Sequence, residues 1–153
     1  MNKIESFKVD HTKLDAGLYV SRKDTKNGVT VTTFDLRVTK PNVCPPIDVP
    51  AIHAIEHIIA TYLRNSEFSG DVVYFGPMGC RTGFYLLMFG DLASEEVFEI
   101  VKNAFKFVCD FQGDIPGASE IECGNYKELN LTTAKYYAKN YLCDLENKNF
   151  EYK

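Results

Sequence analysis

Alternating apolar and polar positions in the first quarter of the chain predict two β-strands. Apolar and β-branched residues are frequent in residues 17–23 and 29–38, and Asn27-Gly28 stands between the two runs. Asn-Gly is a strong signal for a two-residue hairpin turn, because it tolerates the left-handed backbone that such a turn requires. Residues 71–75 and 83–89 are apolar and aromatic, and they predict a second pair of strands joined by a glycine-rich loop.

Helical spacing of apolar positions predicts two helices between and after these strands. Asp48 and Pro50 suit the opening of a helix that runs to about Asn65. Ser94, followed by two glutamates, suits the start of another helix, whose apolar stripe stops before Gly113. Each helix therefore follows one of the strand pairs.

A third helix is predicted after Cys123-Gly124-Asn125, ending near Cys143. Its apolar face would consist of Tyr126, Leu129, Tyr136, Tyr137 and Tyr141. The order of elements, ββα-ββ-αα, predicts an α+β fold in which helices pack on one side of an antiparallel sheet.

Composition limits the number of domains and the kinds of partner. At 153 residues, 45% of them hydrophobic, residues 1–153 fit a single domain that can bury a core. A net charge of −4 argues against nucleic-acid and anionic-membrane partners. The sequence has no signal-peptide pattern and no apolar run of membrane-spanning length, so we expect a cytoplasmic protein. Its five cysteines are an odd number at irregular spacing, which in a reducing compartment favours thiols and thiolate ligands over disulfides, and they contain no CxxC pair.

The run His53-Ala54-Ile55-Glu56-His57 places two histidines four residues apart. On a helix this spacing puts both imidazoles on one face, where they can bind one divalent cation. Glu56 lies near the same stripe, so its carboxylate can move a proton beside that cation. The alternative is a pair of ordinary boundary residues, but the surrounding apolar side chains predict a buried helix whose polar members need a partner. A metal-dependent enzyme is the leading interpretation.

A catalytic metal usually takes three protein ligands and leaves one position open, so a third ligand must come from elsewhere. The candidates are Glu120, Glu122, His11 and the cysteines. Thiolate ranks first, because it binds zinc and ferrous iron strongly. Cys80 and Cys123 each stand beside a glycine, which lets the backbone bring the thiol close to a ligand or substrate. The residues alone do not rank these two cysteines, and a small buried side chain is the alternative for both.

Several separated motifs occur in the order of one enzyme family. They are Ser6-Phe7 with Asp10-His11, Phe34-Asp35-Leu36-Arg37, Pro41-Asn42, His53-x-x-Glu56-His57, Pro77-Met78-Gly79-Cys80-Arg81-Thr82-Gly83-Phe84-Tyr85 and Cys123-Gly124. In these motifs the chain resembles S-ribosylhomocysteine lyase, the LuxS family of the bacterial methyl cycle and autoinducer synthesis, from about Glu5 to Cys143. The resemblance implies the α+β, LuxS/metallopeptidase-like fold of that family.

The resemblance also implies the metal site and the dimer. His53, His57 and Cys123 become the three protein ligands, with water or a substrate oxygen in the fourth position. The metal is typically ferrous iron, although zinc or cobalt can occupy the same tetrahedral site. The family forms homodimers whose sites contain residues of both chains, and Ser6 and His11 would reach across that interface to the amino-acid end of the substrate.

The family's reaction implies roles for three further residues. It opens the ribose ring of S-ribosylhomocysteine, moves the carbonyl along the sugar and eliminates homocysteine, which leaves the autoinducer precursor 4,5-dihydroxy-2,3-pentanedione. Each shift forms an enediolate, which needs a Lewis acid and nearby proton carriers. Glu56 and Cys80 become these catalytic carriers, and Arg37 becomes a substrate-binding residue. We expect Arg37 and the cation to lower the pKa of Cys80.

One departure and two alternatives accompany this interpretation. The family usually carries Asp-Ile-Ser where this chain has Tyr74-Phe75-Gly76, so a carboxylate that contacts the sugar is missing. A catalytically impaired dimer that binds metal or ligand is therefore one alternative. The other is an inverted zinc peptidase, which shares the HxxEH order and would need a carboxylate such as Glu120 or Glu122 as third ligand.

Overall fold

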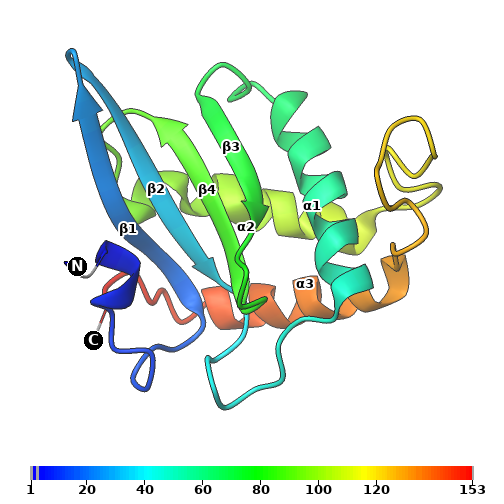
Figure 1. Cartoon of the computed structure of the whole chain (residues 1–153), viewed down its shortest axis with the longest axis horizontal. Coiled ribbons are helices and arrows are strands. Elements are labelled where there is room, and N and C mark those ends of the chain that lie inside the picture. The colour runs from blue at the N-terminus through cyan, green and yellow to red at the C-terminus, as the bar shows by residue number, and fades with distance from the viewer. Residues whose placement is uncertain (1, 3, 153) are drawn as a thin grey trace.

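The structure, a computed structural model, describes residue 2 and residues 4–152. Within these residues four strands form one antiparallel sheet in the order β1-β2-β4-β3. The strands are β1 (Gly17–Lys26), β2 (Val29–Arg37), β3 (Val72–Pro77) and β4 (Gly83–Phe89). The same residues contain a 3-10 helix at Glu5–Phe7 and the helices α1 (Val49–Arg64), α2 (Ser94–Asp110) and α3 (Leu131–Leu145). Figure 1 shows α2 and α3 on one side of the sheet and α1 alongside β3, so the α+β prediction is confirmed.

The β1–β2 hairpin turns at the predicted dipeptide. Lys26 pairs with Val29, which leaves Asn27 and Gly28 as a two-residue loop. Both loop residues have positive φ, 53° and 79° respectively. Turns of this kind match the twist of the strands they connect, which explains why Asn-Gly fixes the register here.

The two faces of β2 have different neighbours. Phe34 and Leu36 point into the hydrophobic core that the sheet shares with the helices, and Ile55 of α1 and Phe105 of α2 belong to the same buried cluster. Because side chains alternate along a strand, Asp35 and its neighbours two residues away point to the opposite face. We call that opposite face the outer face of the sheet.

The third helix begins later than predicted. Asn130 caps it, since its side-chain oxygen accepts a hydrogen bond from Thr133 N at 3.0 Å. The backbone N–H of Asn130 donates to Pro50 O, also at 3.0 Å, and so ties this point of the chain to the start of α1. Tyr126 and Leu129 therefore belong to the preceding loop, although their spacing continues the helical pattern.

The predicted tyrosine face of α3 is also wrong in part. Tyr141 is fully buried and donates a hydrogen bond to Gly17 O at 2.8 Å, whereas Tyr136 is 62% exposed. The other buried positions of the helix are Ala134, Ala138 and Leu145. Small residues let α3 approach α1 and α2 closely, so the contact face is made by alanines that the apolar pattern did not single out.

Candidate metal centre and active site

Helix α1 positions the histidine motif. Asp48 caps the helix by accepting a hydrogen bond from Ala51 N at 2.9 Å. The core side of α1 is fully buried, and it holds the helix against the sheet and the other helices. His53, Glu56 and His57 lie half-buried on the remaining face, which is the face that the spacing predicted.

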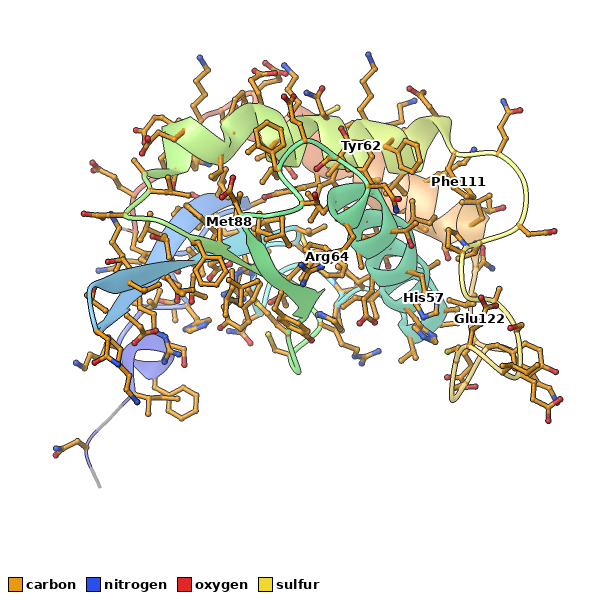
Figure 2. All side chains as sticks on the ribbon, turned by 90° about the horizontal axis from the view of Figure 1, so that it is seen from above. His57, Tyr62, Arg64, Met88, Phe111 and Glu122 are labelled. Atoms are coloured by element: carbon orange, nitrogen blue, oxygen red, sulfur yellow. The ribbon has the colours of Figure 1, made fainter. Side chains whose placement is uncertain are left out.

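The two histidines meet Cys123, which comes from a distant part of the sequence. We call His53, His57 and Cys123 the metal-ligand group. One potential ligand atom from each residue lies within 4.8 Å of the others, and Cys123 Sγ is 3.4 Å from His53 Nε2. Cys123 lies on the connection between α2 and α3, residues 111–130, and Figure 2 shows His57 facing this 111–130 segment near Glu122.

Backbone carbonyls of the same segment fix both imidazole rings. His57 Nδ1–H donates to Pro116 O at 2.7 Å, and His53 Nδ1–H donates to Glu128 O at 3.0 Å. A carbonyl oxygen only accepts, so each Nδ1 carries the proton and each Nε2 keeps its lone pair for a cation. Asn125 N–H donates to Cys123 Sγ at 3.4 Å, so the sulfur is also held by a hydrogen bond within the 111–130 segment.

The donor chemistry of the metal-ligand group fits a tetrahedral first-row transition ion. Two imidazole nitrogens and one thiolate, with a fourth position left for water or substrate, suit zinc, ferrous iron and cobalt. Among the described residues, this is the one group of three or more such side chains that converges. The other candidates are not members of this group: Glu120 and Glu122 are exposed, and His11 donates to Val9 O at 2.9 Å.

Cys80 lies in a second group, at the turn between β3 and β4. Its Sγ is 3.1 Å from Thr82 Oγ1 and 3.9 Å from Arg37 Nη1, and Arg37 also donates to Thr82 Oγ1 at 2.6 Å. Burial alone would raise the pKa of the Cys80 thiol, but the hydrogen bonds from Thr82 and the charge of Arg37 hold it below its usual value. We call Arg37, Cys80 and Thr82 the Cys80 group.

Arg37 is buried on the outer face of the sheet and is not a solvent-facing arginine. Two of its nitrogens bind the Asp35 carboxylate, at 3.1 and 2.5 Å. Tyr152 O–H donates to the same carboxylate at 3.0 Å, and its ring stacks on Tyr19. Burial raises the pKa of Asp35, against the opposing effects of Arg37 and Tyr152. The Asp35 carboxylate therefore holds the Arg37 guanidinium in place beside Cys80.

The two residues predicted to bind the amino-acid end of the substrate also lie by the outer face. Ser6 lines a cavity of about 240 Å³ together with Tyr74 and Tyr85. His11 interacts electrostatically with Asp35. Among the described residues, no hydrogen bond or ion pair joins the metal-ligand group to the Cys80 group.

Sequence reasoning missed three side chains that build the Cys80 group and its surroundings. Asp35 stands two residues before Arg37 on β2, which on a strand means the same face, so its spacing carried a usable signal. Thr82 stands two residues after Cys80 in the turn between β3 and β4, where the strand rule does not apply. Tyr152 reaches Asp35 from 117 positions away, and no local pattern in the sequence indicates that contact.

Comparison with known proteins decides the family. A family model described as S-Ribosylhomocysteinase (LuxS) matches residues 4–151. The chain belongs to the LuxS family. Among LuxS relatives, the S-ribosylhomocysteine lyase of Finegoldia magna is 52% identical over 147 residues, which cover 96% of this chain and 94% of the relative. The lyase of Borreliella burgdorferi (strain ZS7) is 55% identical over 148 residues, with the same coverage, and that of Clostridium beijerinckii is 48% identical over 146 residues, covering 95% and 92%.

Membership of the LuxS family confirms the predicted resemblance and the enzyme class, a carbon–sulfur lyase. It does not favour the inverted zinc peptidase. The role of each site residue and the likeness to metallopeptidases stay predictions. The geometry supports the assignment of Cys123 to the metal and of Cys80 to chemistry, because only Cys123 lies beside the histidines within the part of the chain that the structure describes.

Proposed function

We propose that the chain is a metal-dependent S-ribosylhomocysteine lyase that releases homocysteine and 4,5-dihydroxy-2,3-pentanedione. The observation that carries this proposal is the convergence of His53, His57 and Cys123 in a chain about half identical, over nearly its whole length, to lyases of that name. This donor set would hold a tetrahedral ion and leave one position for a sugar oxygen, which the reaction needs.

Glu56 and Cys80 are the proposed proton carriers. Lewis-acid polarisation of the sugar carbonyl is what the bound metal supplies. Glu56 lies on α1 between the two histidines, so its carboxylate can take a proton from one sugar carbon and return it to another. Cys80 is exposed and its pKa is lowered, so a thiolate is available to accept a proton at an earlier step.

Substrate binding is proposed for Arg37, Ser6 and His11. Arg37 reaches Cys80 and Thr82 at the end of the sheet, and a substrate carboxylate or hydroxyl there would find a guanidinium fixed in orientation. Ser6 and His11 lie along the same outer face, on the N-terminal segment. This distribution supports a binding surface that extends away from Cys80 across the sheet.

The enzyme test is release of free thiol from S-ribosylhomocysteine by the ferrous protein. We expect stoichiometric release that is abolished in Glu56→Gln and Cys80→Ala, while the exposed Glu120→Gln keeps it. Metal content should be unchanged in Glu56→Gln, because that residue is not in the metal-ligand group. Binding of the substrate without thiol release would instead indicate the impaired dimer, and cleavage of a generic peptide would indicate the peptidase.

Ferrous iron is the proposed metal, with zinc or cobalt able to occupy the same donors. Metal analysis of protein purified without oxygen tests this assignment directly. We also propose a cytoplasmic location. No helix among the described residues is long and apolar enough to cross a membrane.

A homodimer with shared sites is the proposed assembly. Large apolar side chains are exposed on the N-terminal segment and the sheet, including Ile4, Phe7, Tyr74 and Phe89. Such residues at one surface are typical of interfaces between subunits.

Mixing two inactive variants tests the shared site. Glu56→Gln and His11→Ala, refolded together, should regain about one quarter of the activity, since half of the dimers are mixed and one of their two sites is intact. Each variant refolded alone is the control. No regain from the mixture would show that Glu56 and His11 serve the same site from one chain.

A further inference from the structure

Gly117 lies against the ring of His57 in the 111–130 segment. Its φ is +71°, in the left-handed region that side chains disfavour. A Cβ added at this position would lie 3.1 Å from His57 Nδ1 and 3.3 Å from Cε1. Both distances are shorter than ordinary van der Waals contact, so a side chain here would press on the imidazole.

The preceding residue supplies the hydrogen bond that orients the same ring. Pro116 O accepts from His57 Nδ1–H at 2.7 Å. With a Cβ on the next residue, the ring or the backbone would have to move by a few tenths of an ångström. Gly117 and the Pro116 carbonyl therefore act together on one face of His57.

We propose that Gly117 is a positioning residue for the metal ligand His57. This inference rests on the proposed metal site and deepens it. Ile55 and Ile58, on either side of the ligand, are fully buried and hold α1 in place. A Cβ at position 117 therefore displaces the imidazole instead of the helix, lengthens the bond to Pro116 O and turns Nε2 away from His53 and Cys123.

Gly113 provides a matched control in the same segment. Its φ is +93°, so alanine there meets the same kind of backbone strain. A Cβ added to Gly113 would meet nothing within 4 Å. The two substitutions therefore differ in the contact with His57.

The experiment measures Co²⁺ binding and the visible spectrum of the bound ion in the full chain, in Gly117→Ala and in Gly113→Ala. We expect Gly117→Ala to weaken Co²⁺ binding roughly 10- to 100-fold, as loss of support to a metal-bound histidine does, and to alter the spectrum. Gly113→Ala should match the unsubstituted chain. In the metal-free protein, the ring ¹⁵N shifts of His57 should show the Nδ1–H form in Gly113→Ala and its partial loss in Gly117→Ala.

Asparagine variants keep the test decisive if the alanine variants fold poorly, because asparagine tolerates positive φ better than alanine while it still carries a Cβ. Equal Co²⁺ affinity and spectrum for Gly117→Asn and Gly113→Asn would overturn the inference and leave the metal site intact. Equal weakening of both would also overturn it, since strain alone would then be the cause. Failure of the unsubstituted chain to bind Co²⁺ would instead refute the proposed metal site, and with it this inference.

Discussion

At the scale of single residues, Cys80 owes its properties to two neighbours of different kinds. Thr82 provides hydrogen bonds and Arg37 provides a charge, and both lower the thiol pKa. Arg37 is itself held by the buried Asp35, so it does not turn away to solvent. The reactivity of the Cys80 thiol therefore depends on Thr82, two positions along the chain, and on Arg37, which β2 carries together with Asp35.

Thr82→Val should raise the Cys80 pKa towards its ordinary value, because it removes the hydroxyl hydrogen bond to Sγ. The alkylation rate of Cys80 rises with pH as the thiolate forms. Its midpoint in the unsubstituted chain should therefore lie below 9.0, the ordinary thiol value, and should move upward in Thr82→Val. Mass mapping of iodoacetamide adducts across a pH series measures this at Cys80 alone. Thr25→Val, at an exposed position of β1, is the control, and a midpoint that is the same in both variants would contradict the prediction.

Tyr74 and Gly76 stand at the two ends of the tripeptide that replaces the family's usual Asp-Ile-Ser, and each residue limits what the other position can hold. A Cβ on Gly76 would lie 2.0 Å from the Tyr74 hydroxyl oxygen, so the tyrosine side chain occupies the space that a serine at position 76 would need. The two replacements are therefore coupled, and the missing carboxylate comes with a phenol beside the Ser6 cavity.

Gly76→Ser should destabilise the unsubstituted chain by about 1 kcal/mol, because Tyr74 must leave its place. The tyrosine is 51% exposed, which gives it room to move and keeps this cost small. In a Tyr74→Asp background the same serine should be nearly neutral, since the ring is gone. Urea unfolding of the four proteins measures the coupling. An equal cost in both backgrounds would show that position 76 is restricted by its backbone instead.

At the scale of elements, α1 carries two of the three residues of the metal-ligand group, and the side chain of Asp48 caps its start. Asp48→Ala should lower the free energy of unfolding by about 1 kcal/mol, whereas Asp48→Asn, which keeps a capping oxygen, should lose little. Urea unfolding checks both. If the two variants lost equal stability, the charge of Asp48 and not its hydrogen bond to Ala51 would be the important feature.

The elements that the sequence predicted well are those with a local signal at each end. Asn27-Gly28 marks the hairpin, Asp48 opens α1, and Glu96 binds the backbone N–H that precedes α2. The start of α3 was wrong because Leu129 continues a helical period into a loop. The capping bond of Asn130 and its link to Pro50 O decide that boundary, and the link is tertiary.

At the scale of the whole molecule, the metal-ligand group joins parts of the chain that are 70 positions apart. Spacing predicted His53 and His57, but no local pattern selected Cys123 over Cys80, and the family resemblance supplied that choice. One cluster of buried side chains extends from Leu18 to Leu145. The single domain of residues 1–153 stays a prediction.

Metal binding should stabilise the folded chain, because folding is what brings the three residues of the metal-ligand group together. At 100 times its dissociation constant, Zn²⁺ should add about 2.7 kcal/mol to the free energy of unfolding. His57→Ala should lose this increment, whereas His11→Ala, outside the metal-ligand group, should keep it. Thermal unfolding with Zn²⁺ and with a chelator measures the difference, and an increment that persists in His57→Ala would place the ion elsewhere.

The 111–130 segment holds His53 and His57 through its carbonyls and also carries Cys123. It has no regular helix or strand of its own, so loss of the ion removes cross-links that help to fasten it to α1. Limited proteolysis should report this directly: a protease that nicks flexible chain should cleave between Phe111 and Asn130 faster once the ion is stripped. A cut on the N-terminal side of Cys123 would leave the sulfur donor and the two nitrogen donors on different fragments.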